Sequence, residues 1–278
     1  MICYYRNSNG QEINLMRYPY RLITADFFTY EWEESTFNGK IYGFSRSIWE
    51  KDVRLDVFCR AAEFPDAMNA LEDIISIDVL KNTPGKIYVN GEYLSCYIKG
   101  VQKDEWEAGI YTVVTLKVIS DKPFWINESS EHFYAKDSIL EDEKSEFLDY
   151  PYDYSYDYTV SDIGSQIWNI DHVVACPFLL TIYGPVTDPR ILIDGRVIEV
   201  YTTLEGNEYL ILDSRDHTII KYLSNGTTQN LYNNRYMEES VFDPIGPGPV
   251  YVTWTGTFGF DITAYIERNE PRWRSRQA

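Results

Sequence analysis

The sequence predicts a mainly β protein, with one packed α-helix in its first half and a β-sandwich in its second half. Most of the chain alternates apolar and polar residues, as half-buried strands do, and Asn-Gly or Asp-Gly pairs separate several of these runs. A single long stretch has a helical period instead. The chain has 278 residues, 44% of them hydrophobic, which is enough to bury a core in each of two domains.

The helix is predicted between Phe64 and Leu80, in the stretch FPDAMNALEDIISIDVL. Its apolar residues recur every three or four positions, which places them on one face of a helix. They are Phe64, Met68, Leu71, Ile75 and Val79. Pro65 and Asp66 suit a helix start, and the NTPG that follows at 82–85 is a stop signal.

Strands are predicted on both sides of a turn at Asn90-Gly91, in KIYVNGEYLSCYI. In TVVTLKVIS the alternation puts Val114, Leu116 and Val118 on one face. Residues 127–149, which include the acidic EDEKSE, have little period of either kind, and we expect an extended arm or loop there.

The second half reads as β throughout, with the runs LLTIYG, RILIDGRVIEV, EYLILDS, HTIIKYLSNG and YVTWTGTFGFDITAYIE. The second run turns at Asp194-Gly195. Short strands with regular turns predict a sandwich. In the last run the alternation predicts a shared buried face. Its members are Phe258, Phe260, Ile262, Ala264 and Ile266.

Between the two halves lies YPYDYSYDYTV, residues 150–160, which we call the Tyr-rich connector. In an extended chain its alternate phenols share one side, whereas a helix would scatter them. Pro151 disfavours a central strand. We expect a semi-rigid connector with the rings packed inward and Asp153 and Asp157 in water. The tyrosines are Tyr150, Tyr152, Tyr154, Tyr156 and Tyr158.

The net charge of −18 argues against nucleic-acid binding, because phosphate contacts need clustered Lys and Arg. Residues 1–150 hold 16 basic and 26 acidic side chains, and the remainder 9 and 17, so both halves are acidic. Solubility alone can explain this. No apolar run is long enough to span a bilayer, and the first residues, MICYYRNSNG, do not resemble a signal peptide.

No motif for catalysis, a metal or a cofactor is found. The cysteines, Cys3, Cys59, Cys96 and Cys176, are scattered, which suits buried or free thiols. The histidines, His132, His172 and His217, have no metal-site spacing, and we expect ordinary surface or loop residues. Two acidic clusters could contain a glycosidase pair, although solvated charge explains them more simply. They are Glu31, Glu33 and Glu34, and residues 141–143.

Aromatic residues in the sandwich, Trp168, Trp254, Trp273 and several tyrosines, could stack sugar rings or fill a protein interface if exposed. Core packing is the alternative for most of them.

Several segments, taken in order, resemble the distal tail (Dit) protein family of siphophages and prophages of Gram-positive bacteria. They are the TPGKIYVNG turn after the helix, SDKPFWI, FLDYPYDYSYDY, LTIYGPVTDPRILIDG, EYLILDSRDHTI, VFDPIGPGPVYVTWTGTFGFDIT and the terminal ERNEPRW. The resemblance covers nearly the whole chain, and the connector followed by TIYGPVTDPRI is its most specific part.

The resemblance implies a tail-tube-like ring-forming β domain at 1–149, the connector at 150–160 and a galectin-like or carbohydrate-module-like sandwich at 161–278. The family is non-enzymatic and has no cofactor. Its members form a hexameric hub at the distal tail tip of the virion, assembled in the cytoplasm of the infected bacterium. Implied partners are other copies of the chain, the tail tube protein, and a tail-associated lysin or fibre and receptor-binding proteins, with genomic DNA passing through the lumen.

Two alternatives remain open at this point. The sandwich could be a carbohydrate-binding module for host cell-wall sugars, because it is rich in aromatic residues. The chain could also be a wall hydrolase that uses two carboxylates, since acidic clusters are present.

Overall fold

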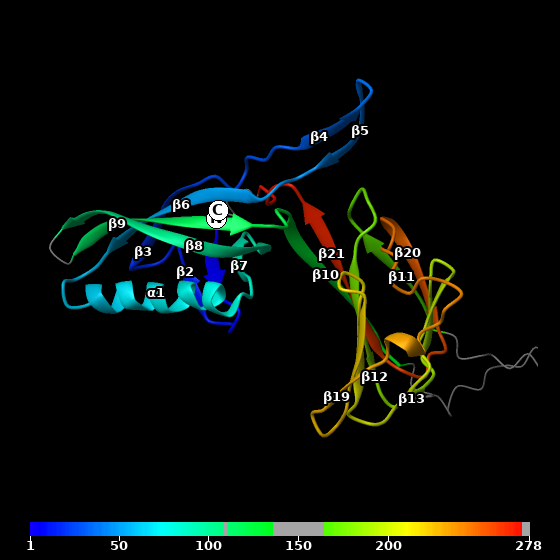
Figure 1. The fold of residues 1–278 in the computed structure, drawn as a ribbon. Coiled ribbons are helices and arrows are strands. Elements are labelled where there is room, and N and C mark those ends of the chain that lie inside the picture. The colour runs from blue at the N-terminus through cyan, green and yellow to red at the C-terminus, as the bar shows by residue number, and fades with distance from the viewer. Residues whose placement is uncertain (108–109, 136–163, 274–278) are drawn as a thin grey trace, which may run out of the picture. The chain divides into compact units, whose positions relative to one another are not determined.

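The computed structural model describes residues 1–107, 110–135 and 164–273, which divide into two compact units (Figure 1). Unit 1 comprises Met1–Asn127 and the segment from Glu267 onward, and unit 2 comprises Glu128–Ile266. The chain passes between the units inside strand β10 (Trp125–Phe133) and again inside strand β21 (Phe260–Arg268). This division differs from the predicted domains, because residues 128–135 belong with the second unit and the chain end with the first. The Tyr-rich connector lies outside the described residues.

Unit 1 is an antiparallel sheet that curls around a core, with one helix. Its sheet has the order β2-β1-β7-β8-β9-β6-β3. Just beyond β2, the Leu15 carbonyl accepts a hydrogen bond of 2.8 Å from the Leu22 N–H in β3, which brings the two outer strands together. Its elements are β1 (Cys3–Arg6), β2 (Glu12–Asn14), β3 (Tyr20–Ala25), β4 (Glu33–Phe37), β5 (Lys40–Ser45), β6 (Trp49–Phe58), α1 (Phe64–Lys81), β7 (Gly85–Val89), β8 (Glu92–Glu107) and β9 (Tyr111–Ser120).

The predicted helix is confirmed as α1, which lies along the sheet and contacts β2, β6 and β8 (Figure 1). Phe64, Leu71 and Ile75 are buried as expected and Met68 is partly buried. Val79 is 49% exposed, so its predicted place in the core was wrong. Asp78 takes that place and is fully buried. Its carboxylate accepts hydrogen bonds from the Tyr5 hydroxyl and from the Ser8 N–H, at 2.7 Å for the latter. These two donors make burial of an aspartate possible.

The predicted hairpin at Asn90-Gly91 is confirmed, and both turn residues have the positive φ, 54° and 93°, that such a tight turn requires. The three predicted core residues of β9, Val114, Leu116 and Val118, are at most 1% exposed. The extended arm or loop expected from residue 127 is wrong as far as residue 133, because these residues complete a paired strand, β10. Between its buried ends this strand carries mostly polar side chains, so its local pattern does not identify it.

Unit 2 is a two-layer sandwich, as predicted. One sheet has the order β19-β18-β17-β12-β21-β10 and the other β11-β20-β14-β15, and the inner faces of both supply its core. The Asp194-Gly195 turn joins β14 to β15, and the five residues predicted to share a face at 258–266 are all buried. Its further elements are β11 (Gly164–Ile170), β12 (Phe178–Tyr183), β13 (Val186–Thr187), β14 (Arg190–Ile193), β15 (Arg196–Glu199), β16 (Thr203–Leu204), β17 (Tyr209–Asp213), β18 (Thr218–Tyr222), β19 (Thr228–Asn230), η1 (Tyr232–Asn234) and β20 (Gly248–Trp254).

Candidate interaction surfaces

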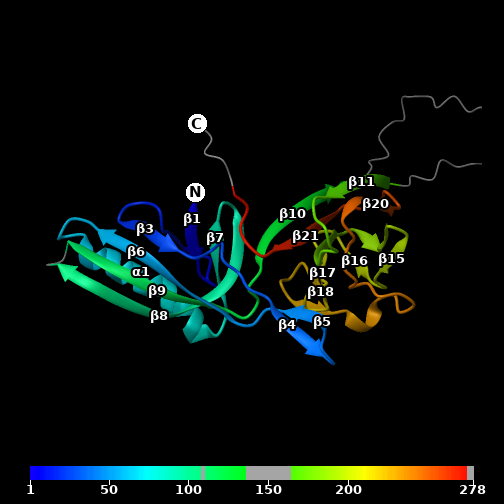
Figure 2. The same ribbon diagram turned by 90° about the horizontal axis from the view of Figure 1, so that it is seen from above.

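The hairpin of β4 and β5 exposes apolar side chains on both of its faces. Among the described strands, β4 and β5 pair only with each other, and both views show the hairpin extending away from the rest of unit 1 (Figures 1 and 2). Phe37 is 71% exposed, Tyr42 73% and Phe44 62%. An isolated two-stranded ribbon is only marginally stable in water, and exposed apolar patches mark interaction sites. The hairpin therefore has the character of a docking element.

The root of this hairpin is held by Arg46, just after β5. Its guanidinium carbon lies 5.7 Å from the centre of the Tyr30 ring and 5.2 Å from that of Phe124, and Trp32 packs beside them. Burial lowers the pKa of Arg46. A cation among three aromatic rings is stabilised by their negative faces. The root is consequently packed into unit 1, whereas Phe37, Tyr42 and Phe44 nearer the tip are mostly exposed.

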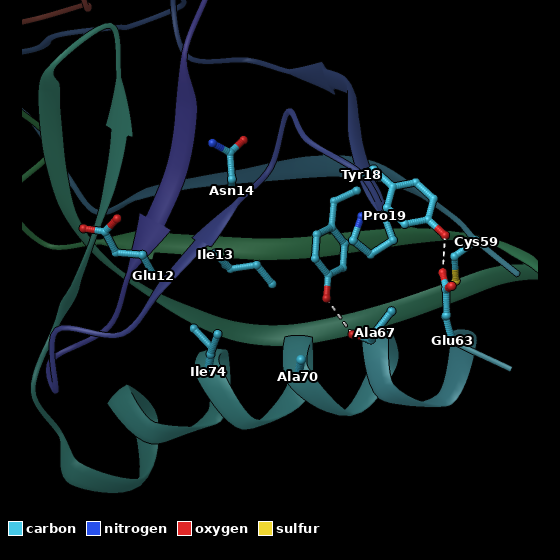
Figure 3. Close-up of a pocket in the computed structure, with 11 residues that line it drawn as sticks. Glu12, Ile13, Asn14, Tyr18, Pro19, Cys59, Glu63, Ala67, Ala70 and Ile74 are labelled. Carbon is cyan, nitrogen blue, oxygen red and sulfur yellow. Dashed lines mark hydrogen bonds between the residues drawn. The ribbon is translucent and has the colours of Figure 1, made fainter.

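A pocket of about 410 Å³ lies between α1 and the chain that leads into β3 (Figure 3). The Tyr18 hydroxyl donates a hydrogen bond to the Glu63 carboxylate, and the Tyr20 hydroxyl donates to the Ala67 carbonyl at 2.6 Å. Both bonds tie this chain to the first turns of α1. Cys59 also lines the pocket, and burial, with the nearby Glu63 carboxylate, raises the pKa of its thiol. A protonated thiol is a weak nucleophile, so Cys59 is not activated for covalent chemistry.

A second groove, of about 680 Å³, flanks the last turns of α1 on the side of β8. Its apolar lining includes Val79 and Leu80, and the side chain of Leu80 is 82% exposed. Lys99 and Lys103 also line it, and Lys99 pairs with Glu50 at 2.5 Å. The groove thus combines apolar side chains with basic ones and with the acidic Glu72.

The residues singled out from sequence fall into separate places. The five connector tyrosines lie outside the described residues, as do residues 141–143. Glu31, Glu33 and Glu34 are exposed, on or beside β4. All four cysteines are buried free thiols, as predicted. His217 lies in the predicted turn before β18 with φ of 53°, and His132 is exposed on β10.

The tryptophans proposed as exposed aromatics are mostly in the core. Trp168 is 5% and Trp254 4% exposed, and the Trp254 indole N–H donates to the Phe258 carbonyl at 3.1 Å. Trp273 is 74% exposed, although one face of its ring stacks on Phe28 at 4.1 Å. Core packing therefore explains two of the three tryptophans.

Two further searches bear on function. In the described part of the chain, no helix is both long and apolar enough to cross a membrane. Within the same residues, no group of three or more His, Cys, Asp or Glu side chains is arranged to hold a metal ion.

The fold defines a class of mainly β proteins with a single-helix sheet unit and a sandwich unit. No protein-family model and no curated protein matches the sequence. Solved structures do match. The Dit protein of phage SPP1, a hub of the adsorption apparatus of phages that infect Gram-positive bacteria, has a TM-score of 0.58 and 11% identity, covering 96% of this chain and 98% of its own.

Chains of the phage p2 baseplate in its activated conformation are similar to the same extent. The form with Ca has a TM-score of 0.58 and 12% identity, covering 98% of this chain and 100% of its own. The form with Sr has a TM-score of 0.60 and 13% identity, covering 97% and 99%. The chain therefore has a Dit-like fold over nearly its whole length, which confirms at the level of fold the family resemblance seen in the sequence.

Proposed function

We propose that this protein is a structural hub at the distal end of a siphophage tail. By this proposal copies of the chain form a closed ring, of six subunits by analogy with the family, that joins the tail tube to the baseplate, to tail fibres or to a tail-associated lysin. The Dit-like fold along nearly the full chain carries the proposal. The location at the virion tail tip and the non-enzymatic role are part of the same proposal.

The β4–β5 hairpin supports ring formation. In a cyclic ring each subunit offers one surface to the next and receives another, so a projecting apolar element suits one side of such a heterologous contact. If Phe37, Tyr42 and Phe44 each buried about 100 Å² in the neighbour, the gross gain at roughly 25 cal/mol per Å² would be about 7 kcal/mol per contact. Ordering and association costs reduce this figure, and closure of the ring adds further contacts.

The test is the subunit count of the intact chain, measured by mass in solution and by imaging of assembled tail tips. We expect a closed ring at the tip, and a triple change of Phe37, Tyr42 and Phe44 to serine should abolish it. The matched control changes Val173 and Val174 to serine. These residues are 85% and 57% exposed in unit 2 and should leave the ring intact. Absence of the chain from the tail tip, or its presence there as a monomer, would refute the hub assignment.

The carbohydrate-module alternative loses two of the three tryptophans that suggested it, because Trp168 and Trp254 are in the core, and the exposed Trp273 belongs to unit 1. Other side chains in unit 2 nevertheless provide the aromatic and hydroxyl groups that suit a sugar ligand.

A further inference from the structure

We propose that the exposed face of the sheet β10-β21-β12-β17-β18 in unit 2 binds a neutral saccharide through a row of side chains that crosses all five strands. We call this set the cross-strand row. It consists of His132, Asp261, Tyr183, Tyr209 and Tyr222. The proposal does not rest on ring formation, because every member of the row lies within unit 2.

Strand register creates the row. Tyr183 in β12 lies opposite Tyr209 in β17, and Tyr209 lies opposite Tyr222 in β18. Asp261 in β21 is the diagonal neighbour of Tyr183, because Thr181 is its direct partner. Neighbouring strands are about 4.8 Å apart, so five strands carry the row over about 19 Å. That is the length of a short oligosaccharide.

Asp261 organises one end of the row. One of its carboxylate oxygens lies 2.7 Å from His132 Nδ1, and the other accepts a hydrogen bond of 2.7 Å from the Tyr183 hydroxyl. A carboxylate has about four acceptor positions, so two contacts leave acceptor sites for ligand hydroxyls. The Asp261 side chain is 28% exposed and that of His132 57% exposed, so a ligand can reach both.

Burial and Asp261 raise the pKa of Tyr183, and Asp261 raises that of His132. Burial, followed by the hydrogen bond to Asp261, raises the pKa of Tyr183 to about 12, so its phenol stays protonated. The hydrogen bond to Asp261 also raises the pKa of His132. Asp261 thus offers acceptors, and Tyr183 beside it is 43% exposed. Fixed donors and acceptors reduce the ordering cost of binding.

Aromatic surface continues the row beyond Asp261. The rings of Tyr209 and Tyr222 stack on each other, with centroids 4.7 Å apart and planes 7° apart. Their residues are only partly buried. Next to the row, Ser130 Oγ and Thr263 Oγ1 lie 2.8 Å apart on β10 and β21. The face therefore combines apolar ring surface with hydroxyl and carboxylate groups.

This combination fits a neutral polyol better than other ligands. Pyranose rings present C–H groups that pack on aromatic faces and hydroxyls that need hydrogen-bond partners. An anionic polymer would meet Asp261 on a chain of net charge −18. A protein partner would bury Asp261 within the row, and charged residues such as aspartate are depleted from the centres of protein interfaces.

The experiment uses the full chain on an array of neutral and anionic oligosaccharides, followed by titration calorimetry with any oligosaccharide that binds. We expect neutral oligosaccharides to bind, and Tyr183→Phe and Asp261→Asn each to weaken binding at least tenfold. Tyr251→Phe is the matched control, because Tyr251 is 56% exposed on the opposite sheet in β20. It should leave affinity unchanged.

Thermal unfolding of each variant separates loss of binding from loss of fold, and Tyr183→Phe, which keeps the ring, serves if Asp261→Asn is unstable. No binding to any oligosaccharide overturns the proposal, as does binding that both variants leave unchanged. Selective binding of anionic oligosaccharides also overturns it. Capture of a purified tail protein that depends on Tyr183, without saccharide binding, would assign the face to a protein partner instead.

Discussion

Replacing Tyr5 with phenylalanine removes the hydroxyl that donates to the buried Asp78 carboxylate. Both residues are fully buried, and within the described part of the chain the one other donor to this carboxylate is the Ser8 N–H, at 2.7 Å. Burial is the main cause that raises the pKa of Tyr5, with contributions from Cys96 and from the hydrogen bond to Asp78. The proton therefore belongs to the phenol, and Asp78 is the acceptor. The substitution leaves the ring and its packing in place, so it isolates the hydrogen bond.

The expected loss in the free energy of unfolding depends on whether the hydrogen-bond acceptor is charged. A hydrogen bond to a charged group contributes about 1.5–3 kcal/mol, and a neutral one about 1 kcal/mol. Tyr5→Phe should therefore lower the free energy of unfolding by about 2–3 kcal/mol. Tyr20→Phe is the matched control, since the Tyr20 hydroxyl is also buried in unit 1 but donates to a neutral carbonyl, that of Ala67. Its cost should be about 1 kcal/mol.

Urea unfolding of the full chain measures both costs, and hydrogen exchange of the Ser8 amide reports locally on Asp78. Exchange at Ser8 should accelerate in Tyr5→Phe and not in Tyr20→Phe. Combining Tyr5→Phe with Asp78→Asn removes the buried charge, so the double variant should cost less than the two single changes added. A cost for Tyr5→Phe no greater than for Tyr20→Phe would refute this account of the pair.

Four further predictions follow from the structure and the sequence. Gly85→Ala should destabilise unit 1 by about 1–3 kcal/mol in urea unfolding, because its Cβ would collide with the Tyr5 hydroxyl and the Asp78 carboxylate, whereas Gly43→Ala, with open space around it, should be nearly neutral. Burial raises the pKa of Tyr20 from 10.0 to about 12. The contribution of Tyr20 to stability is therefore complete below pH 10 and is lost as the pH rises toward 12. Tyr20→Phe should reduce the fall in thermal stability over that pH range. Serine at the three central tyrosines of the Tyr-rich connector should loosen the angle between the domains in solution scattering without unfolding either one, and unchanged geometry would contradict the role we predict for them. In an assembled ring, acidic side chains of residues 1–150, with a net charge of −10, should line part of the lumen, and a neutral or positive wall along its whole length would contradict this.

Local signals explain which parts of the fold the sequence predicts. The turns at Asn90-Gly91 and Asp194-Gly195 are visible because the positive φ of a tight hairpin is a property of the turn residues themselves. The Asn38-Gly39 turn carries the same signal, with φ of 51° and 73°. Treating it as a turn would have predicted the β4–β5 hairpin from sequence.

Long-range contacts explain what the sequence does not predict. The helical pattern places both Asp78 and Val79 near the buried face of α1. Asp78 is the one that is buried because Tyr5 and Ser8, some 70 residues away, donate hydrogen bonds to it. Strand β10 likewise depends on partners far along the chain, because His132 meets Asp261 across 129 residues. Sequence alternation assigns a side chain to a face, but it does not give the register that places two side chains together.

The β4–β5 hairpin and the cross-strand row differ in chemistry in a way that separates assembly from recognition. Permanent interfaces are apolar, because their surfaces need not be soluble on their own for long, and the hairpin matches that description. The row combines ring surface with satisfied polar groups, so it remains stable in water with or without a ligand. Ring formation and saccharide binding should therefore be lost independently of each other. Serine at Phe37, Tyr42 and Phe44 should prevent ring formation while the subunit still binds saccharide, and Tyr183→Phe should give complete rings that bind it at least tenfold more weakly.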